Sequence, residues 1–208
     1  MKLSWTALCA SCALCLLCAC AARRPDHFYI LSAQPPGPAE ARSLPAAQAV
    51  LRVSLPSLLD RPEMILNTSA DGVVVLEHER WAAPLTDLVT QTLARDLERR
   101  RADLLVSEGI NRAGGPVTKI AVEVVQMSVR RGESISIETH WRILDPLGGG
   151  DQVGGEVFSS PLRQEDYAAV ARGLSECLAL LADRLAQQLP APAGASTILE
   201  APAPASVH

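Results

Sequence analysis

The stretch Gln164–Leu189, QEDYAAVARGLSECLALLADRLAQQL, carries the clearest structural pattern in this 208-residue sequence. At about 100° per residue, most of its large apolar side chains fall within a single arc of about 140°, which is typical of a helix with one buried face. The residues on this arc are Tyr167, Val170, Ala171, Leu174, Cys177, Leu178, Leu181, Ala182, Leu185 and Leu189. We therefore predict a long C-terminal helix whose apolar face packs on a sheet.

Two residues of this helix lie at or beyond the edge of the apolar arc. Cys177 is at its rim, so we interpret this residue as a semi-buried small apolar side chain and not as a reactive thiol. Leu180 projects well outside the arc. An apolar side chain in that position is a candidate for contact with another chain.

The sequence before this helix alternates apolar and polar residues in three segments, as half-buried strands do. These segments are residues 117–130, 134–144 and 153–159, which are separated by a tight turn at 131–133 and a Gly-rich turn at 145–151. In the first segment the alternation slips by one residue at Val124-Val125, which predicts a β-bulge. We expect three consecutive antiparallel strands.

Shorter strands are predicted nearer the N-terminus. They cover residues 27–31, 51–55, 64–67, 73–79 and 103–106, and the third and fourth form a hairpin whose turn includes Asp71-Gly72. Residues 32–48 contain four prolines and are expected to form a loop or linker. Side chains alternate along a strand, so His78 should point away from Glu77 and Glu79, and these three residues should not converge on a metal ion.

A second amphipathic helix is predicted from Pro84, which suits a first helical turn, to about Arg101. Its apolar residues recur at helical spacing and are Leu85, Leu88, Val89, Leu93 and Leu97. Asp96 falls inside this apolar arc. A buried carboxylate would need a partner such as Arg99, Arg100 or a sheet arginine. We favour the alternative that Asp96 lies near a frayed helix end and is solvated.

Two helices with one apolar face each, together with a mostly antiparallel sheet, predict an α+β fold with both helices packed on one face of the sheet. The pattern does not fix the strand order. A compact part of about 160 residues can bury roughly 70% of its unfolded surface, so we predict a single domain at residues 27–189. The Ala/Pro-rich residues 190–208 are expected to form a disordered tail.

The first 22 residues are expected to direct export, because Lys2, an apolar run and small residues follow one another as in a secretory signal peptide. The sequence Leu17-Cys18-Ala19-Cys20 also resembles the bacterial lipobox, in which the last cysteine becomes the lipidated N-terminus. We predict a signal peptide at residues 1–19, a lipid anchor at Cys20, and an anchor and spacer segment at residues 20–26.

Two alternatives concern the same leader. Its first four cysteines, Cys9, Cys12, Cys15 and Cys18, have a spacing close to that of iron–sulfur ligands. However, spacers of Ala, Ser and Leu within an apolar leader do not form a ligand loop. The 20 residues Leu3–Ala22 are also long enough for an uncleaved membrane anchor, in which case the lipobox would be accidental.

The exported chain is mildly acidic and has few reactive groups. Loss of Lys2 leaves 18 basic and 23 acidic side chains, or a net charge of −5, which argues against nucleic-acid binding. Five of the six cysteines lie at or before position 20, so no intramolecular disulfide is expected.

Nucleophile-elbow, zinc-protease and phosphate-loop motifs are absent from the sequence, and His27, His78, His140 and His208 are scattered. We predict no enzyme, cofactor or metal; a hydrolase would require distant Ser, His and acidic side chains to converge.

Four segments in this order resemble the PqiC-like (YmbA-type) lipoproteins, which are described as auxiliary lipoprotein components of ABC-type transporters. These segments are the lipobox at Cys20, residues 28–31 (FYIL), residues 59–65 (LDRPEMI) and residues 79–85 (ERWAAPL). The Asp-Arg-Pro and Arg-Trp-Ala segments are specific together and weak singly. The resemblance extends over about residues 17–189, while the Pro-rich loop and the tail match no family pattern.

The resemblance implies a non-enzymatic lipoprotein in the inner leaflet of the outer membrane. It also implies that this lipoprotein works together with an inner-membrane MCE-domain protein. The two would move lipid across the periplasm and maintain envelope integrity. Ala21 fits this location, because the usual inner-membrane retention signal is an Asp at that position. The family is also similar to ring-forming oligomers, so a homo-oligomeric ring is expected, and lipid is a further candidate ligand. The alternative is a scaffold or assembly lipoprotein of another envelope complex.

Five residues of the two specific segments are candidates for a structural or partner-facing role: Asp60, Arg61, Pro62, Arg80 and Trp81. Tryptophan is enriched both in protein cores and in interface hot spots. For Trp81 we favour a core position at the start of the second helix.

Overall fold

The structure is a computed structural model that describes residues 24–35, 47–69, 71–108 and 116–190. The predicted signal peptide, the anchor at Cys20, most of the Pro-rich loop and the tail after residue 190 lie outside the described residues. Within the described ranges, the two helices are too short or too polar to cross a membrane.

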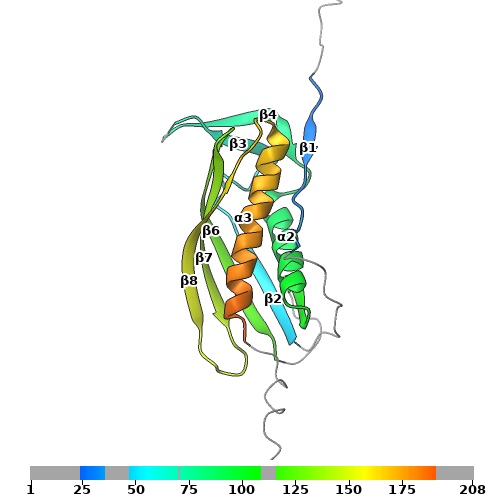
Figure 1. Cartoon of the computed structure of the whole chain (residues 1–208), viewed down its shortest axis with the longest axis vertical. Coiled ribbons are helices and arrows are strands. Elements are labelled where there is room, and N and C mark those ends of the chain that lie inside the picture. The colour runs from blue at the N-terminus through cyan, green and yellow to red at the C-terminus, as the bar shows by residue number, and fades with distance from the viewer. Residues whose placement is uncertain (1–23, 36–46, 70, 109–115, 191–208) are drawn as a thin grey trace, which may run out of the picture.

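Two sheets and two helices make up the described chain (Figure 1). The small sheet has the order β1 (His27–Tyr29), β4 (Val73–Trp81), β3 (Glu63–Asn67). The large sheet has the order β5 (Leu104–Glu108), β2 (Ala47–Ser54), β6 (Thr118–Arg130), β7 (Ser134–Leu144), β8 (Gln152–Pro161). The helices are α2 (Leu85–Arg100) and α3 (Tyr167–Gln188).

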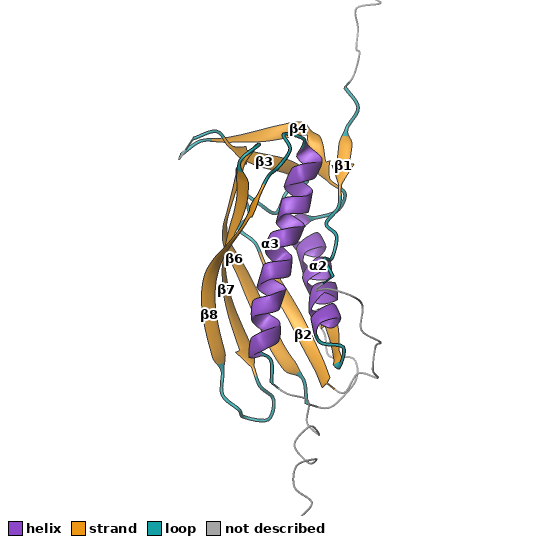
Figure 2. Cartoon of the chain, viewed as in Figure 1, coloured by secondary structure: helices purple, strands orange, loops and turns teal. Residues whose placement is uncertain are grey.

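Both helices pack on one face of the large sheet, and the small sheet covers the upper end of the molecule (Figure 2). Helix α3 lies over β7 and β8, whereas α2 lies over β2 and β5 and packs against α3. The largest buried side chains between these layers include Leu51, Leu93, Ile120, Ile137 and Leu178. The predicted α+β class is confirmed, with both helices on one face.

The three predicted antiparallel strands are confirmed as β6, β7 and β8. The ladder shifts register between Val124 and Gln126, which confirms the bulge at the point where the alternation slips. Gly132 has φ 75° in the turn between β6 and β7, a left-handed conformation that glycine adopts without steric cost. Parallel pairs of β2 with β5 and β6, and of β1 with β4, complete the sheets.

The boundary of the second strand differs from the prediction. Strand β2 begins at Ala47, inside the predicted loop at residues 32–48, and its ladder pairs Ala47 with Leu104 and Ala49 with Thr118. Alanine has little intrinsic strand preference. Here the hydrogen bonds to a neighbouring strand on each side decide the conformation.

Cys177 is fully buried, not semi-buried at a rim. The reason lies one turn earlier, where a Cβ at Gly173 would clash with the side chains of Ile135 and Leu162. The glycine lets α3 approach the sheet closely, so the sheet covers Cys177, whose Sγ lies 3.8 Å from the Ile135 carbonyl oxygen. Burial raises the pKa of this thiol to about 12, which disfavours the reactive thiolate.

Asp96 is also fully buried, so the favoured interpretation of a solvated side chain was wrong. Its Oδ1 accepts a hydrogen bond from the backbone N–H of Gln34, at 2.7 Å, and another from Arg100 Nη1, at 3.3 Å. Residues 31–34, which we call the crossing segment, run over α2 and α3 and exclude water from this carboxylate. Ser32 N–H donates to Ser175 Oγ on α3, which fixes the same segment to the second helix.

Candidate functional site

The two specific sequence segments meet at the start of α2, although about 20 residues separate them in the chain. The Trp81 amide donates to the Pro62 carbonyl oxygen at 2.7 Å. Glu63 accepts from Arg61 Nε at 3.1 Å and lies 3.2 Å from Arg80 Nη2. The structure thus brings together all five residues predicted for this site, with Glu63 between the two arginines. We call this group, Asp60 to Glu63 with Arg80 and Trp81, the motif junction.

Local structure explains how the junction forms. A turn closed by hydrogen bonds to the Pro56 carbonyl leads to Asp60, and Pro62 restricts Arg61 to extended backbone at the start of β3. Strand pairing then places Glu63 opposite Arg80, the penultimate residue of β4. The ends of two strands therefore fix the junction.

Asp60 supplies a helix cap from a distant segment. The N-cap residue of α2 is Pro84, which makes no side-chain cap. Asp60 Oδ1 accepts from the Thr86 amide at 3.2 Å, so it satisfies one of the amides left free in the first turn. A carboxylate at a helix N-terminus also interacts favourably with the helix dipole. Asp60 therefore joins the junction to α2.

The two faces of the junction differ in exposure. Trp81 is 3% exposed and lies within the core, the position of a core residue at the start of α2. The Arg61 and Arg80 side chains are 36% and 31% exposed. The hydrogen bond from Arg61, assisted by the charge of Arg80, lowers the pKa of Glu63. The carboxylates of Asp60 and Glu63 balance the charges of Arg61 and Arg80, so the junction is formally neutral, with both guanidiniums partly exposed.

Strand β1 borders the junction and is fixed by polar contacts on its inner side. Glu79 accepts from the Tyr29 hydroxyl at 2.6 Å and lies 3.1 Å from His27 Nδ1. Burial, followed by the bond to Glu79, raises the pKa of Tyr29. His78 Nδ1 lies 2.9 Å from Asp26. Within the described ranges, His, Cys, Asp and Glu form no group of three or more with the arrangement of a metal site.

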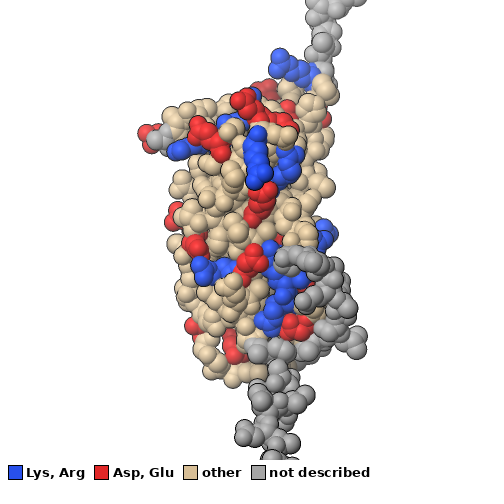
Figure 3. Space-filling model, in the orientation of Figure 1, with Lys and Arg blue, Asp and Glu red and all other residues tan. Residues whose placement is uncertain are grey.

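Phe28, on the outer side of β1, and Ile30, just after the end of this strand, are each 63% exposed. Phe28 pairs in register with Arg80, so the aromatic ring borders the arginines of the junction. Charged side chains of both signs intermingle at the upper end of the face shown in Figure 3, and no single-sign patch forms on that face.

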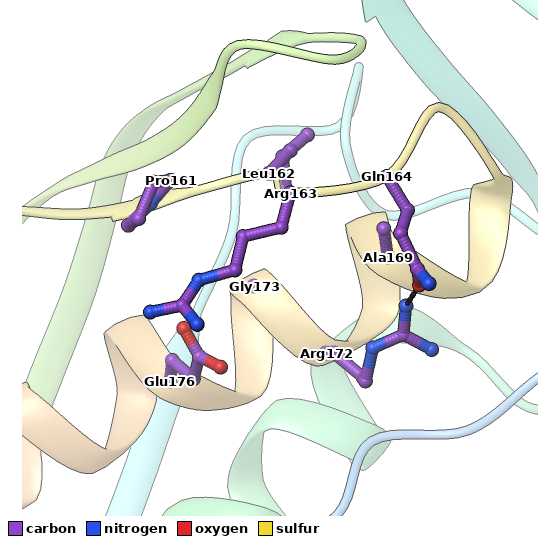
Figure 4. A pocket seen from close by; sticks show the side chains of 8 residues that line it. All are labelled: Pro161, Leu162, Arg163, Gln164, Ala169, Arg172, Gly173 and Glu176. Atoms are coloured by element: carbon purple, nitrogen blue, oxygen red, sulfur yellow. Dashed lines mark hydrogen bonds between the residues drawn. The ribbon is translucent and has the colours of Figure 1, made fainter.

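Two shallow cavities lie along α3. The first, of about 370 Å³, lies between the end of β8 and the first turns of α3 and is lined by Pro161, Leu162, Arg163, Gln164, Ala169, Arg172, Gly173 and Glu176. In Figure 4 the Arg163 guanidinium points towards Glu176, and Arg172 binds Gln164. Ser160 donates to Glu176. The lining contains no histidine or cysteine.

The second cavity, of about 400 Å³, lies between β8 and the second half of α3. Leu180, the predicted contact residue, lines it and is 44% exposed. An ion pair at 2.8 Å between Arg184 and Glu156 crosses this surface from helix to strand. This lining also lacks histidine and cysteine.

Sequence reasoning missed three features of this region. It did not identify Glu63 as the shared partner of two arginines, although Glu63 follows Asp60-Arg61-Pro62 directly. It did not predict that Asp60 caps α2. The exposed side of β1 was also missed, and its only signal was an apolar run too continuous for a strand with one buried face.

Comparison with known proteins was made for both sequence and structure. Residues 29–186 match the family described as ABC-type transport auxiliary lipoprotein component. No curated protein matches the sequence. One similar solved structure is a crystal structure of an uncharacterized protein, with TM-score 0.63 and 16% identity over 79% of this chain and 99% of that one. Another is protein XCC0632 from Xanthomonas campestris, described under the family name DUF330, with TM-score 0.60 and 18% identity over 77% of this chain and 92% of that one. At these identities the structures show a shared fold.

Proposed function

This chain belongs to the family of ABC-type transport auxiliary lipoprotein components, and on that premise we propose that it is a non-enzymatic outer-membrane lipoprotein of an MCE-type intermembrane lipid transport system. In this role it would support envelope integrity by holding an inner-membrane MCE-domain protein in place. The observation that carries the proposal is the motif junction. The two segments on which the resemblance to the family rests form one hydrogen-bonded unit with its arginines at the surface.

The junction suits a docking role better than a chemical one. Trp81 is in the core, and its backbone amide donates to the Pro62 carbonyl oxygen, which joins the two segments. Arg61 and Arg80 are partly exposed and already oriented by Glu63. Arginines oriented before binding lose little side-chain freedom when they contact a partner carboxylate or phosphate.

We also propose a homo-oligomeric ring. The large sheet ends in β5 on one side and β8 on the other. Exposed apolar residues accompany both edges, with Leu105 on β5, Val157 on β8 and Leu180 on the neighbouring α3. A contact between two different surfaces of identical subunits closes into a ring when the rotation allows it.

Affinity purification of the acylated full-length protein from its own membranes tests the transport proposal. An MCE-domain protein should be recovered with it. Arg61→Ala should reduce the recovery severalfold, whereas Arg142→Ala should not, because Arg142 is an exposed arginine far from the junction on β7. Recovery of a different envelope complex, and of no MCE-domain protein, would instead support the scaffold alternative.

The anchor is tested separately. Cys20→Ala should abolish acyl labelling and release a soluble or unprocessed form, because no thiol would remain at the cleavage point. Acyl labelling and mass spectrometry of the mature N-terminus provide the measurement. Labelling that persists at Cys18 would show that the predicted site is wrong.

A further inference from the structure

Strand β1 and the two residues that follow it, Ile30 and Leu31, carry apolar side chains on both faces. Tyr29 packs against the core and Leu31 is 5% exposed, while Phe28 and Ile30 point outwards and are each 63% exposed. A strand with only one covered face usually alternates apolar and polar residues, and one covered on both faces does not. The outer face of β1 therefore has the composition of a surface that another phase or molecule covers.

Charged side chains lie next to this outer face. Phe28 pairs with Arg80 on β4, and Arg80 pairs with Glu63 on β3, so these three residues form a row across the small sheet. Residues that are paired in this way project to the same side of a sheet. Arg61 joins the row through Glu63. We call Phe28 and Ile30 the β1 patch; Arg80 on β4 borders it, whereas Arg61 lies beyond β4, next to β3.

We propose that the β1 patch lies against the phospholipid headgroups of the leaflet that holds the protein's acyl chains. This inference rests on the lipid anchor of the proposed function. Phe28 is only eight positions after Cys20 in the sequence. Even fully extended, this stretch of chain places Phe28 no more than about 29 Å from the anchor. The first exposed large apolar residues of the described chain therefore lie within a short distance of the membrane surface.

The chemistry of the patch matches this surface. An aromatic and an aliphatic side chain beside cationic groups is the composition of protein surfaces that bind at the headgroup region. Guanidinium groups bind phosphate oxygens, and the Arg80 side chain beside Phe28 is 31% exposed. The position of β1 in the domain agrees with this placement. The described chain begins at the upper end of the molecule, beside β1, and the turn between β7 and β8 lies at the opposite end (Figure 1).

Tryptophan fluorescence of the full-length acylated protein in vesicles tests the proposal. Phe28→Trp places a reporter on the patch, and Leu147→Trp is the matched control, because Leu147 is 68% exposed in the turn between β7 and β8. Trp81 and Trp141 are 3% and 4% exposed and provide a constant background, which the parent protein measures. The vesicles contain phosphatidylethanolamine and phosphatidylglycerol, with or without brominated acyl chains.

Brominated lipid should quench the added fluorescence of Phe28→Trp at least twofold and leave that of Leu147→Trp unchanged. Ile30→Trp provides a second reporter on the same face and should give the same result. Equal quenching of the reporters at positions 28 and 147 would overturn the proposal. So would a blue-shifted emission at position 28 that brominated lipid does not quench, because the patch would then be covered by protein.

A mass spectrum of each preparation separates this test from that of the anchor. If the protein is not acylated at Cys20, the anchor in the proposed function fails and the inference fails with it. If the protein is acylated but the reporter at position 28 is not quenched, only the inference about the β1 patch fails.

Discussion

At the scale of single residues, Asp96 shows how a carboxylate inside the helix pair fixes the chain above it. One oxygen accepts from the Gln34 amide and from Arg100, while the other, Oδ2, is buried without a hydrogen-bond partner. Arg100 also binds Asp183 on α3, so α2, α3 and the crossing segment share one polar cluster. The unsatisfied oxygen makes ionisation of Asp96 costly.

Asp96 should make the protein less stable as pH rises. Burial, opposed by the Gln34 amide and Arg100, raises the pKa of Asp96 from 3.8 to about 6. Between pH 4 and 6 the folded state therefore holds a proton that the unfolded state has lost. The contribution to the free energy of unfolding is fully present below pH 4, and about 3 kcal/mol of it is lost as pH rises through 6.

Asp96→Asn should remove this dependence, as measured by urea unfolding at pH 4, 5, 6 and 7. Other carboxyls, such as Glu63 and Asp103, have lowered pKa values and contribute the opposite slope. The informative quantity is therefore the difference between parent and variant in how the free energy of unfolding changes with pH. Asp87→Asn, in the exposed first turn of the same helix, is the control. Equal slopes for both variants would contradict the assignment to Asp96.

Asp60 allows a second test at this scale. Asp60→Ala removes the acceptor for the Thr86 amide and should lower the free energy of unfolding by about 1 kcal/mol, the usual cost of losing a helix cap. Asp60→Asn keeps an acceptor oxygen and should recover most of the loss in the same denaturation experiment. If both variants are equally destabilised, the charge or the packing of Asp60 matters more than the cap.

At the scale of secondary structure, β1 is a three-residue strand whose side chains are fixed to β4 through Glu79. This carboxylate contacts both His27 and Tyr29. Glu79→Ala should therefore loosen β1 while the large sheet stays intact. Loss of two hydrogen bonds, about 1.4 kcal/mol in total, predicts about tenfold faster amide exchange at residues 27–30. Glu77→Ala, an exposed position on β4, should leave exchange unchanged. Uniformly faster exchange across the sheets would show that Glu79 supports the whole fold.

Elements with a long regular pattern were predictable from sequence. Helix α3 and strands β6 to β8 follow from apolar periodicity, and even the bulge at Val125 was visible as a slip in alternation. Pairing between distant segments was not, because periodicity says which face is buried but not which strand is the neighbour. Thus the parallel pairing of β2 with β5 and β6, and the start of β2 at Ala47, required the structure.

The same limit applies to the candidate site. The resemblance pointed to Arg61 and Trp81, but only the structure shows that Glu63 links Arg61 to Arg80. Burial of Asp96 was not predictable, because the crossing segment that covers it is distant in sequence and has no helical or strand periodicity. Cys177 was misplaced because helical projection does not show how closely α3 approaches the sheet at Gly173.

At the scale of the whole molecule, the surface between β8 and α3 tests the proposed ring. Leu180, on α3, and Val157, on β8, are 44% and 59% exposed around the second cavity. If a neighbouring subunit covers them, Leu180→Glu should place an unpaired charge in that contact and shift the acylated protein in detergent to a smaller species in sedimentation. Leu147→Glu, which changes a leucine that is 68% exposed on the β7–β8 turn, is the control. An assembly that Leu180→Glu leaves unchanged would exclude this surface from the ring contact, and a monomeric parent protein would contradict the ring itself.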